Sequence, residues 1–214
     1  PSALTATSHV IGFARACEPR RGCPPLAPIR PVSVAGRSSG LVPEAPIANL
    51  RGYHNTYEQA KAEAETMLLA QMAAGLPATI HRPSMVVGDS RDGRIIHFQV
   101  FYYLAGFLAG SRTRGILPAF GDVKLDLVPA DHVARCVVAS IGRADSIGRI
   151  FHLCAGPAQA APLAEIGEAL RHFLRAQGER TFNPRYLPRG AMRVPTFGCA
   201  ETSPLAASVR IASR

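Results

Sequence analysis

The chain has 214 residues, of which 47% are hydrophobic, and its 24 lysines and arginines outnumber 15 aspartates and glutamates, giving a formal net charge of +9. This length and hydrophobic content allow a sizeable buried core and exclude a disordered chain. The basic residues are mostly arginines scattered singly, which disfavours a nucleic-acid-binding protein. The longest mainly apolar stretch, residues 98–110, is too short to span a membrane, and residues 1–30 lack the apolar run of a signal peptide, so we expect a cytoplasmic protein.

The first fifty residues carry little periodic pattern. Residues 1–31 are rich in proline, with clustered arginine and glycine, which defeats both helical and strand periodicity. We therefore predict that they form an irregular segment. Residues 32–36 (VSVAG) are predicted to form a short strand, and a long surface loop follows it. Loops of this length usually carry function or lack fixed structure.

The most regular pattern starts at Asn55. Asn55 or Thr56 can cap a helix, Glu58 lies in its first turn, and apolar residues recur at helical spacing until Gly75. The run PATIHRP then predicts a strand that ends before Pro83, because the residue before a proline is held in extended geometry. The following residues, MVVGDSRDGR, continue this strand into a turn rich in glycine and aspartate.

The remaining elements alternate in type. We predict a helix over residues 95–109, an extended segment over 125–129, a helix capped by Asp131 that runs to Ile141, a strand over 149–155 and a helix over 163–176. This alternation predicts an α/β architecture with parallel strands. Residues 179–214 are rich in proline, arginine and serine, and we predict that they form an irregular tail.

Tyr57 and Lys61 stand out because the chain has only two lysines, Lys61 and Lys124. Positions four apart on a helix share a face, so both side chains can meet one substrate. A lysine ammonium near a phenol favours the phenolate and brings the tyrosine toward the range of a working proton donor or acceptor. Carbonyl reduction needs such a group, because negative charge grows on the oxygen as hydride reaches the carbon. A pair at this spacing also occurs by chance, so its place at a capped helix start gives it weight.

The run NTYEQAKAEAETMLLAQMAAGLPATIHRPSMVVGDSRDGRI, residues 55–95, closely resembles the short-chain dehydrogenase/reductase superfamily, in the extended branch that includes thioester reductase domains and fatty acyl-CoA reductases. The later runs LDLVPADHVARCVVAS and GRIFHLCAGP are similar to the same branch. The resemblance covers roughly residues 32–175. It implies a partial NAD(P)-binding reductase domain over residues 32–178, with the carboxyl-terminal part of a Rossmann-like doubly wound parallel sheet and a small substrate-binding region.

The resemblance also implies roles for individual residues. Tyr57 is expected to be the catalytic acid, and Lys61 to hold the nicotinamide ribose and support the tyrosine. Cofactor contacts are expected from four consecutive residues, Pro83, Ser84, Met85 and Val86. The implied cofactor is NADP or NAD, and the implied partner is a small-molecule or carrier-bound acyl thioester substrate. Family members often pair through a helix like the one predicted at residues 56–74, so a homodimer is also expected.

Two features of the family are missing from the sequence. A glycine-rich turn of the TGxxGxxG type normally holds the pyrophosphate at a helix amino terminus, and the chain contains none. Alignment of VSVAG with the family's corresponding strand end places Arg30 where a catalytic serine belongs, and Ser33 lies three residues away. We therefore expect a fragment that lacks on the order of 100 residues of a nucleotide-binding half.

Other functions remain open at this point. A sugar-nucleotide epimerase or dehydratase uses the same tyrosine and lysine chemistry, and a catalytically silent fragment or an interaction module fits the missing glycine-rich turn and serine. A basic nucleic-acid binder has the least support. The seven histidines never fall at metal-ligand spacing and the five cysteines form no CxxC pair, so we expect no metal site and ordinary thiols.

Overall fold

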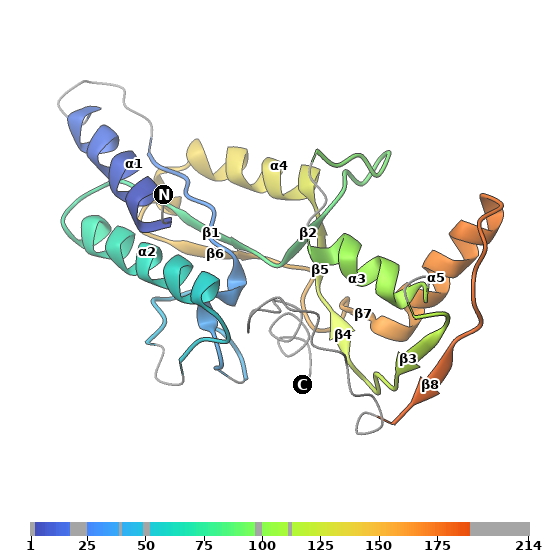
Figure 1. The fold of residues 1–214 in the computed structure, drawn as a ribbon. Helices are drawn as coiled ribbons and strands as arrows, with labels where there is room; N and C mark the ends of the chain where they lie inside the picture. The colour runs from blue at the N-terminus through green and yellow to red at the C-terminus, as the bar shows by residue number, and fades with distance from the viewer. Residues whose placement is uncertain are drawn as a thin grey trace.

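The computed structural model describes residues 3–17, 25–38, 40–48, 52–96, 100–110 and 113–188 (Figure 1). The α-helices of this part are α1 (Ala3–Cys17), α2 (Thr56–Ala73), α3 (Val100–Leu108), α4 (Ala130–Ile141) and α5 (Leu163–Ala176), and its 3₁₀ helices are η1 (Val32–Ala35) and η2 (Ala144–Ser146). Its strands are β1 (Ile80–Pro83), β2 (Met85–Val87), β3 (Ile116–Pro118), β4 (Lys124–Leu125), β5 (Leu127–Pro129), β6 (Ile150–Leu153), β7 (Ala161–Pro162) and β8 (Arg185–Leu187). None of the helices in the described ranges is both long and apolar enough to cross a membrane.

The strands pair mostly in parallel. β1 pairs with β6 in the register Ile80↔Ile150 to Pro83↔Leu153, and β2 pairs in parallel with β5. Residues 26–30 add further parallel bridges on the other side of β1, at Leu26↔Ala78 and Ile29↔His81. Parallel neighbours require crossover connections, and helices supply them here. The expected α/β fold with parallel strands is therefore confirmed.

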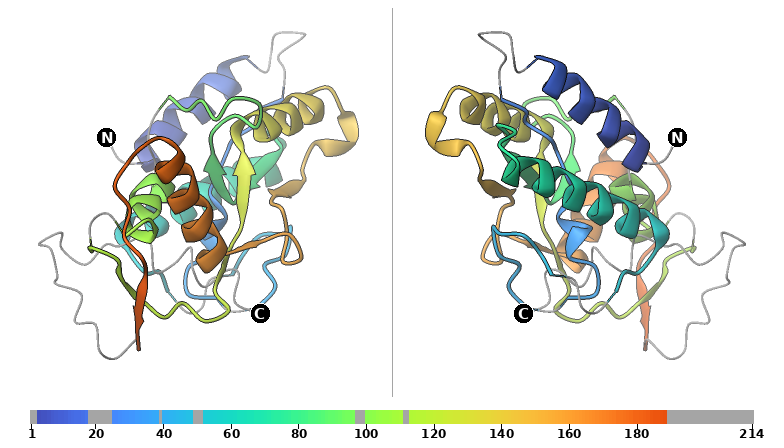
Figure 2. Two further views of the ribbon diagram at one scale, coloured as in Figure 1. Left: turned by 90° about the vertical axis from the view of Figure 1, so that its right-hand side faces the viewer. Right: turned by 90° about the vertical axis from the view of Figure 1, so that its left-hand side faces the viewer.

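Alternate residues of β1 face opposite layers of helices. Ile80 packs with Ile11 of α1 and Leu68 of α2, which lie side by side (Figure 2). The next residue, His81, bonds instead to Ser140 of α4. Because side chains alternate across a strand, α1 and α2 cover one face of this sheet and α4 covers the other. All four residues of β1 are buried, as expected for a strand covered on both faces.

A second hydrophobic cluster lies in the right-hand part of Figure 1, where α3 and α5 pack together. Leu104 and Leu108 of α3 meet Leu125 of β4 and Leu163 of α5 in its centre. Met85 of β2 is packed against the same cluster, so the junction between β1 and β2 joins this region to the main parallel sheet. The region around this second cluster lies beyond the carboxyl end of β1, and in open α/β sheets ligands bind at the carboxyl ends of the strands.

The structure corrects the prediction for the amino-terminal segment. Residues 3–17 form helix α1 rather than irregular chain. Prolines follow this helix but do not interrupt it, and averaging over residues 1–31 hid the helix formers ahead of them. The predicted strand at residues 32–36 is also wrong, because residues 32–35 form η1 and Gly36, at φ 57°, ends it with its amide bonded to the Ser33 carbonyl.

Three further predictions change. Asp131 lies in the first turn of α4, but Pro129 is the N-cap residue and the Asp131 carboxylate does not cap the helix. The helix expected over residues 95–109 begins at Val100 within the described residues. In the expected irregular tail, residues 185–187 form β8 parallel to β3, while residues 189–214 lie outside the described residues. Predicted helices at 55–75 and 163–176 are confirmed as α2 and α5.

Arg82 of β1 is fully buried and ties four segments together. Its Nε and Nη2 donate to the Glu65 carboxylate on α2 at 3.2 and 2.6 Å. Its Nη1 and Nη2 also donate to the carbonyl oxygens of Pro43 and Ala45, at 3.1 and 3.0 Å. A fifth contact runs from Nη1 to Nε2 of His152 on β6, at 3.2 Å. Every N–H of the guanidinium group therefore has a partner, which offsets the cost of burying the charge.

Replacing Glu65 with leucine should strongly destabilise the fold, because it leaves the Arg82 charge buried and unpaired. We expect the free energy of unfolding to fall by about 3–5 kcal/mol, measured by urea denaturation followed by circular dichroism. Glu63→Leu is the matched control, since Glu63 is an exposed glutamate on the same helix and should change stability by less than about 0.5 kcal/mol. Equal effects of the two substitutions would contradict this role of the pair.

Candidate active site

Helix α2 begins with a reciprocal cap that fixes its first turn. The Asn55 side-chain oxygen accepts from the Glu58 amide at 2.8 Å, and the Glu58 carboxylate accepts from the His54 amide at 3.0 Å. This pair satisfies one free amide of the first turn, that of Glu58, and the amide of the residue before the cap. Of the two caps that the sequence allowed, Asn55 and Thr56, the structure uses Asn55. Tyr57 lies in this capped turn, and Lys61 follows one turn later.

The structure brings Tyr57 and Lys61 together. The Lys61 Nζ atom lies 5.4 Å from the centroid of the Tyr57 ring. The Tyr57 side chain is 57% exposed, so its hydroxyl group is open to a substrate, while Lys61 is half-buried. A cation over an aromatic face at this distance is attracted by the ring, which holds the two side chains on one face of α2.

The predicted cofactor contacts lie at the junction of β1 and β2. Pro83 ends β1 and is buried, and Met85 and Val86 begin β2 half-buried. The Ser84 amide donates to the Leu153 carbonyl at 3.0 Å, so the junction is bonded to β6. The Ser84 hydroxyl oxygen is buried and has no hydrogen-bond partner among the described residues. Buried polar atoms normally have a hydrogen-bond partner. Because the Ser84 hydroxyl has none among the described residues, it is available to a bound molecule.

A short loop closes against α4 after β2. The Ser90 amide and hydroxyl both donate to the Asp131 carboxylate, each at 2.9 Å. Arg135 also bonds to this carboxylate, at 2.8 Å. The bonds from Ser90, followed by the charge of Arg135, lower the pKa of Asp131. No local pattern predicted this Ser90–Asp131 link, and its one sequence signal is the aspartate two residues after the proline in the run VPADH.

Gly88 gives this loop its tight turn. A Cβ atom at position 88 would collide with the carbonyl oxygen of Gly93, so only glycine fits. The Gly88 amide donates to the Tyr102 hydroxyl on α3 at 3.1 Å. The loop that follows the predicted cofactor contacts is therefore bonded to both α3 and α4.

Arg30 occupies the place that the alignment assigned to a serine. It ends the parallel segment beside β1, and its Nη2 donates to the Thr7 hydroxyl on α1 at 2.8 Å. Burial lowers the pKa of Arg30, and the charge of Glu65 partly opposes this. Arg30 lines the same cavity as Lys61, with a volume of about 330 Å³. Ser33 lies in η1, so neither residue presents a hydroxyl group at the end of this segment.

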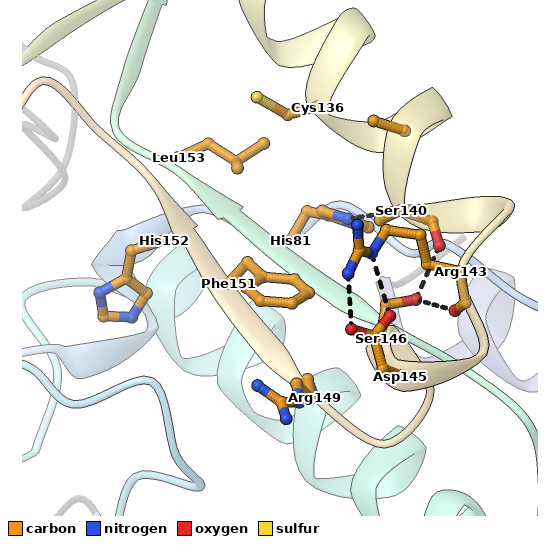
Figure 3. A pocket seen from close by; sticks show the side chains of 11 residues that line it. His81, Cys136, Ser140, Arg143, Asp145, Ser146, Arg149, Phe151, His152 and Leu153 are labelled. Carbon is orange, nitrogen blue, oxygen red and sulfur yellow. Dashed lines mark hydrogen bonds and ion pairs between the residues drawn. The ribbon is translucent and has the colours of Figure 1, made fainter.

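A second cavity, of about 460 Å³, lies on the α4 face of β1 and β6 (Figure 3). Nε2 of His81 lies 2.8 Å from the Ser140 hydroxyl, which itself donates to the Val137 carbonyl at 2.8 Å. Because that hydroxyl has one proton, Nε2 of His81 is the donor and the buried Nδ1 is left without a partner among the described residues. Burial lowers the pKa of His81. Tyr57 and Lys61 do not line this cavity.

The fold and the Tyr57–Lys61 pair define the class of the protein. Parallel strands with helices on both faces, and a tyrosine and a lysine one turn apart on a capped helix, are the features of a short-chain dehydrogenase/reductase domain. The family model described as male sterility protein, a model of NAD-binding domains, matches residues 6–137. This match covers more than half of the chain, so the chain belongs to that family, within the thioester reductase branch of the extended superfamily.

Individual relatives agree with this assignment. An isonitrile lipopeptide synthase from Streptomyces coeruleorubidus is 30% identical over 146 residues, which are 64% of this chain and 10% of that protein. An L-2-aminoadipate reductase from Schizosaccharomyces pombe is 30% identical over 104 residues, or 49% of this chain and 7% of that protein. The chain therefore spans a tenth or less of these relatives.

Solved structures give the same fold. The terminal R domain from the myxalamid PKS-NRPS biosynthetic pathway is 30% identical with a TM-score of 0.59, and the match covers 77% of this chain and 39% of that domain. A putative epimerase from Burkholderia cenocepacia has a TM-score of 0.60 at 19% identity, over 87% of this chain and 55% of that protein, which shows the shared fold alone. The predicted cofactor class, NAD or NADP, is confirmed by the family.

The loop after β2 gives a testable pH dependence. Hydrogen bonds from Arg91 lower the pKa of Asp89 to about 2, well below its usual value near 3.9. Because the folded-state pKa is depressed, the stabilisation from this carboxylate is fully present above pH 4 and is lost as the pH falls toward 2. We expect an NMR titration of the Asp89 carboxyl carbon to show its midpoint near pH 2.

Arg91→Gln should move the Asp89 midpoint upward, because it removes the side-chain bonds to the carboxylate. Arg94→Gln is the control, since Arg94 pairs with Asp92 instead. An Asp89 midpoint near 4 in the unsubstituted protein would show that the Arg91 pair does not form in solution.

Proposed function

We propose that this chain contributes the catalytic tyrosine and lysine of an NAD(P)H-dependent reductase that acts on a carrier-bound acyl thioester. One observation carries the proposal: Tyr57 and Lys61 are held against each other on the capped first turns of α2, with the phenol exposed. Membership of the thioester reductase branch supports the substrate class. The chain spans 39% of the myxalamid R domain, so the activity requires the rest of such a domain.

The residues present fit the nicotinamide end of the cofactor. Lys61 supplies an ammonium group that can donate to ribose hydroxyls, and the buried Ser84 hydroxyl supplies a free hydrogen-bonding group at the end of β1. Pro83, Met85 and Val86 form the backbone and apolar surface on either side of Ser84. The sequence contains no TGxxGxxG turn. The residues named here would therefore hold the nicotinamide end of the cofactor and not its pyrophosphate.

The chemistry assigned to the side chains is proton transfer and charge stabilisation. A bound reduced nicotinamide supplies the hydride that reaches the thioester carbonyl carbon. Tyr57 donates its hydroxyl proton to the carbonyl oxygen as negative charge develops there, which gives a hemithioacetal. Lys61 stabilises the phenolate that remains. The hemithioacetal then breaks its carbon–sulfur bond and releases an aldehyde and the carrier thiol, so atoms and electrons balance.

The proposal is tested first by binding and then by turnover. The chain, joined to the amino-terminal part of the myxalamid R domain that lies before the match, is titrated with NADPH and NADH while nicotinamide fluorescence is followed. Turnover is measured as NADPH oxidation with an acyl pantetheine thioester as the probe. Saturable binding and turnover of the thioester support the proposal. Turnover of nucleotide sugars but not of the thioester would favour the epimerase alternative. A folded joined protein that binds neither dinucleotide would contradict the proposal.

Tyr57→Phe should lower kcat about 100- to 10,000-fold while the Kd for NADPH changes less than about twofold, because only the proton donor is lost. Tyr103→Phe is the matched control, since Tyr103 is a tyrosine of similar exposure, 59%, on α3. Equal kcat values for Tyr57→Phe and the unsubstituted protein would remove Tyr57 from the mechanism.

A further inference from the structure

A short exposed segment between η1 and α2, residues 43–45, is held to the sheet by few bonds. Residues 41–48 make no backbone–backbone hydrogen bond within the described part of the chain. Two carbonyl oxygens of the segment accept from the buried guanidinium group of Arg82, at 3.1 and 3.0 Å. The Glu44 carboxylate accepts from the backbone amide of His152 on β6, at 2.6 Å. We call residues 43–45 the strap.

The ring of His152 contacts the same guanidinium group that holds the strap. Its Nε2 atom lies 3.2 Å from Nη1 of Arg82. A guanidinium group has only donors, so Nε2 accepts this bond and the neutral ring carries its proton on Nδ1. His152 and Phe151 point to opposite sides of β6, which places the His152 ring on the Arg82 side of the sheet (Figure 3).

A protonated His152 ring cannot keep this contact. Nε2 would then carry a proton and face the donors of Arg82, with two positive charges at a distance of 3.2 Å. Arg82 cannot yield, because its guanidinium group is fully buried, always charged and bonded to Glu65 at 2.6 Å. The strap is the part that can move, since it is held by the two carbonyl bonds and the Glu44 bond alone among the described residues.

The groups around His152 favour its neutral form. Burial, followed by the charge of Arg82, lowers the pKa of His152, and the charges of Glu44 and Glu65 partly oppose this. The net result is a ring that is neutral near pH 7. The cavity of Figure 3, which His152 also lines, adds further titratable or charged side chains, those of His81, Cys136, Arg143, Asp145 and Arg149.

We propose that the strap is a pH-sensitive closure: neutral His152 holds it against β1 and β6, and protonation of the ring releases it. The strap precedes the capped first turn of α2, and Arg82 lies next to Pro83 at the end of β1. Release therefore exposes the guanidinium group beside the cofactor contacts expected at residues 83–86.

NMR of the 214-residue chain between pH 7.5 and 4.5 tests the strap. Nitrogen signals of the His152 ring report its tautomer and protonation, and hydrogen exchange at the His152 amide reports the bond to Glu44. Because the closed form has the lower pKa, closure is fully stabilised above about pH 6.5 and weakens as the pH falls below that value. We expect the protection factor of this amide to fall about fivefold or more between about pH 7.5 and 5, since the opening constant rises up to about tenfold per pH unit between the two pKa values.

His152→Gln should abolish this pH dependence, because the glutamine oxygen still accepts from Arg82 but does not titrate. The protection factor at residue 152 should then change less than about twofold over the same range. His172→Gln is the matched control. His172 is an exposed histidine on α5, so this variant should keep the pH dependence of the unsubstituted chain.

Glu44→Gln separates titration of His152 from titration of Glu44, because it keeps an acceptor for the amide but has no carboxyl group. The pH dependence should persist in this variant. Its loss, while the His152 ring still titrates, would assign the change to Glu44 and overturn the proposal.

Two further outcomes would overturn it. One is equal protection of the His152 amide with the ring neutral and protonated, and the other is a ring that stays neutral throughout the titration. The measurements need neither cofactor nor substrate, so failure of the proposed reductase activity leaves their outcome unchanged.

Discussion

The structure depends most on the buried guanidinium group of Arg82. It joins α2, the 43–45 loop and β6 to the central strand β1, through Glu65, two carbonyl oxygens and His152. Burial and the positive charge of Arg82 lower the pKa of His152, which keeps its ring neutral and able to accept the bond. Because Glu65 lies one turn after Lys61, the same pair fixes how the helix that carries Tyr57 and Lys61 lies against the end of β1.

Local patterns gave the correct helix and strand at residues 55–83, because a side-chain cap, an unbroken helical period and a proline act within a few residues. The same reasoning missed α1, since prolines that follow the helix dominated the composition of residues 1–31. It also placed a strand at residues 32–36, where residues 32–35 form a 3₁₀ helix between Pro31 and Gly36. Local patterns cannot predict long-range contacts. The Arg82–Glu65 pair and the Ser90–Asp131 link join residues 17 and 41 positions apart, respectively, and no local spacing indicates them.

Two cavities lie against different parts of the sheet. The cavity in Figure 3 lies on the α4 face, where His81 and Ser140 are hydrogen-bonded to each other. Tyr57 does not line this cavity. The other cavity is lined by residues 26–30 and by Lys61, so the segment beside β1 and the helix that carries Tyr57 share one hollow.

The central claim is that Tyr57, Lys61 and the β1–β2 junction form one nicotinamide site, although they lie on different elements. A crystal structure with NADPH, of this chain joined to the amino-terminal half of the R domain, tests it most directly. The account predicts the nicotinamide ring beside the Tyr57 hydroxyl, the adjoining ribose within hydrogen-bond distance of Lys61, and a bond to the Ser84 hydroxyl. A dinucleotide bound in the cavity between α4 and β6, away from Tyr57, would contradict it.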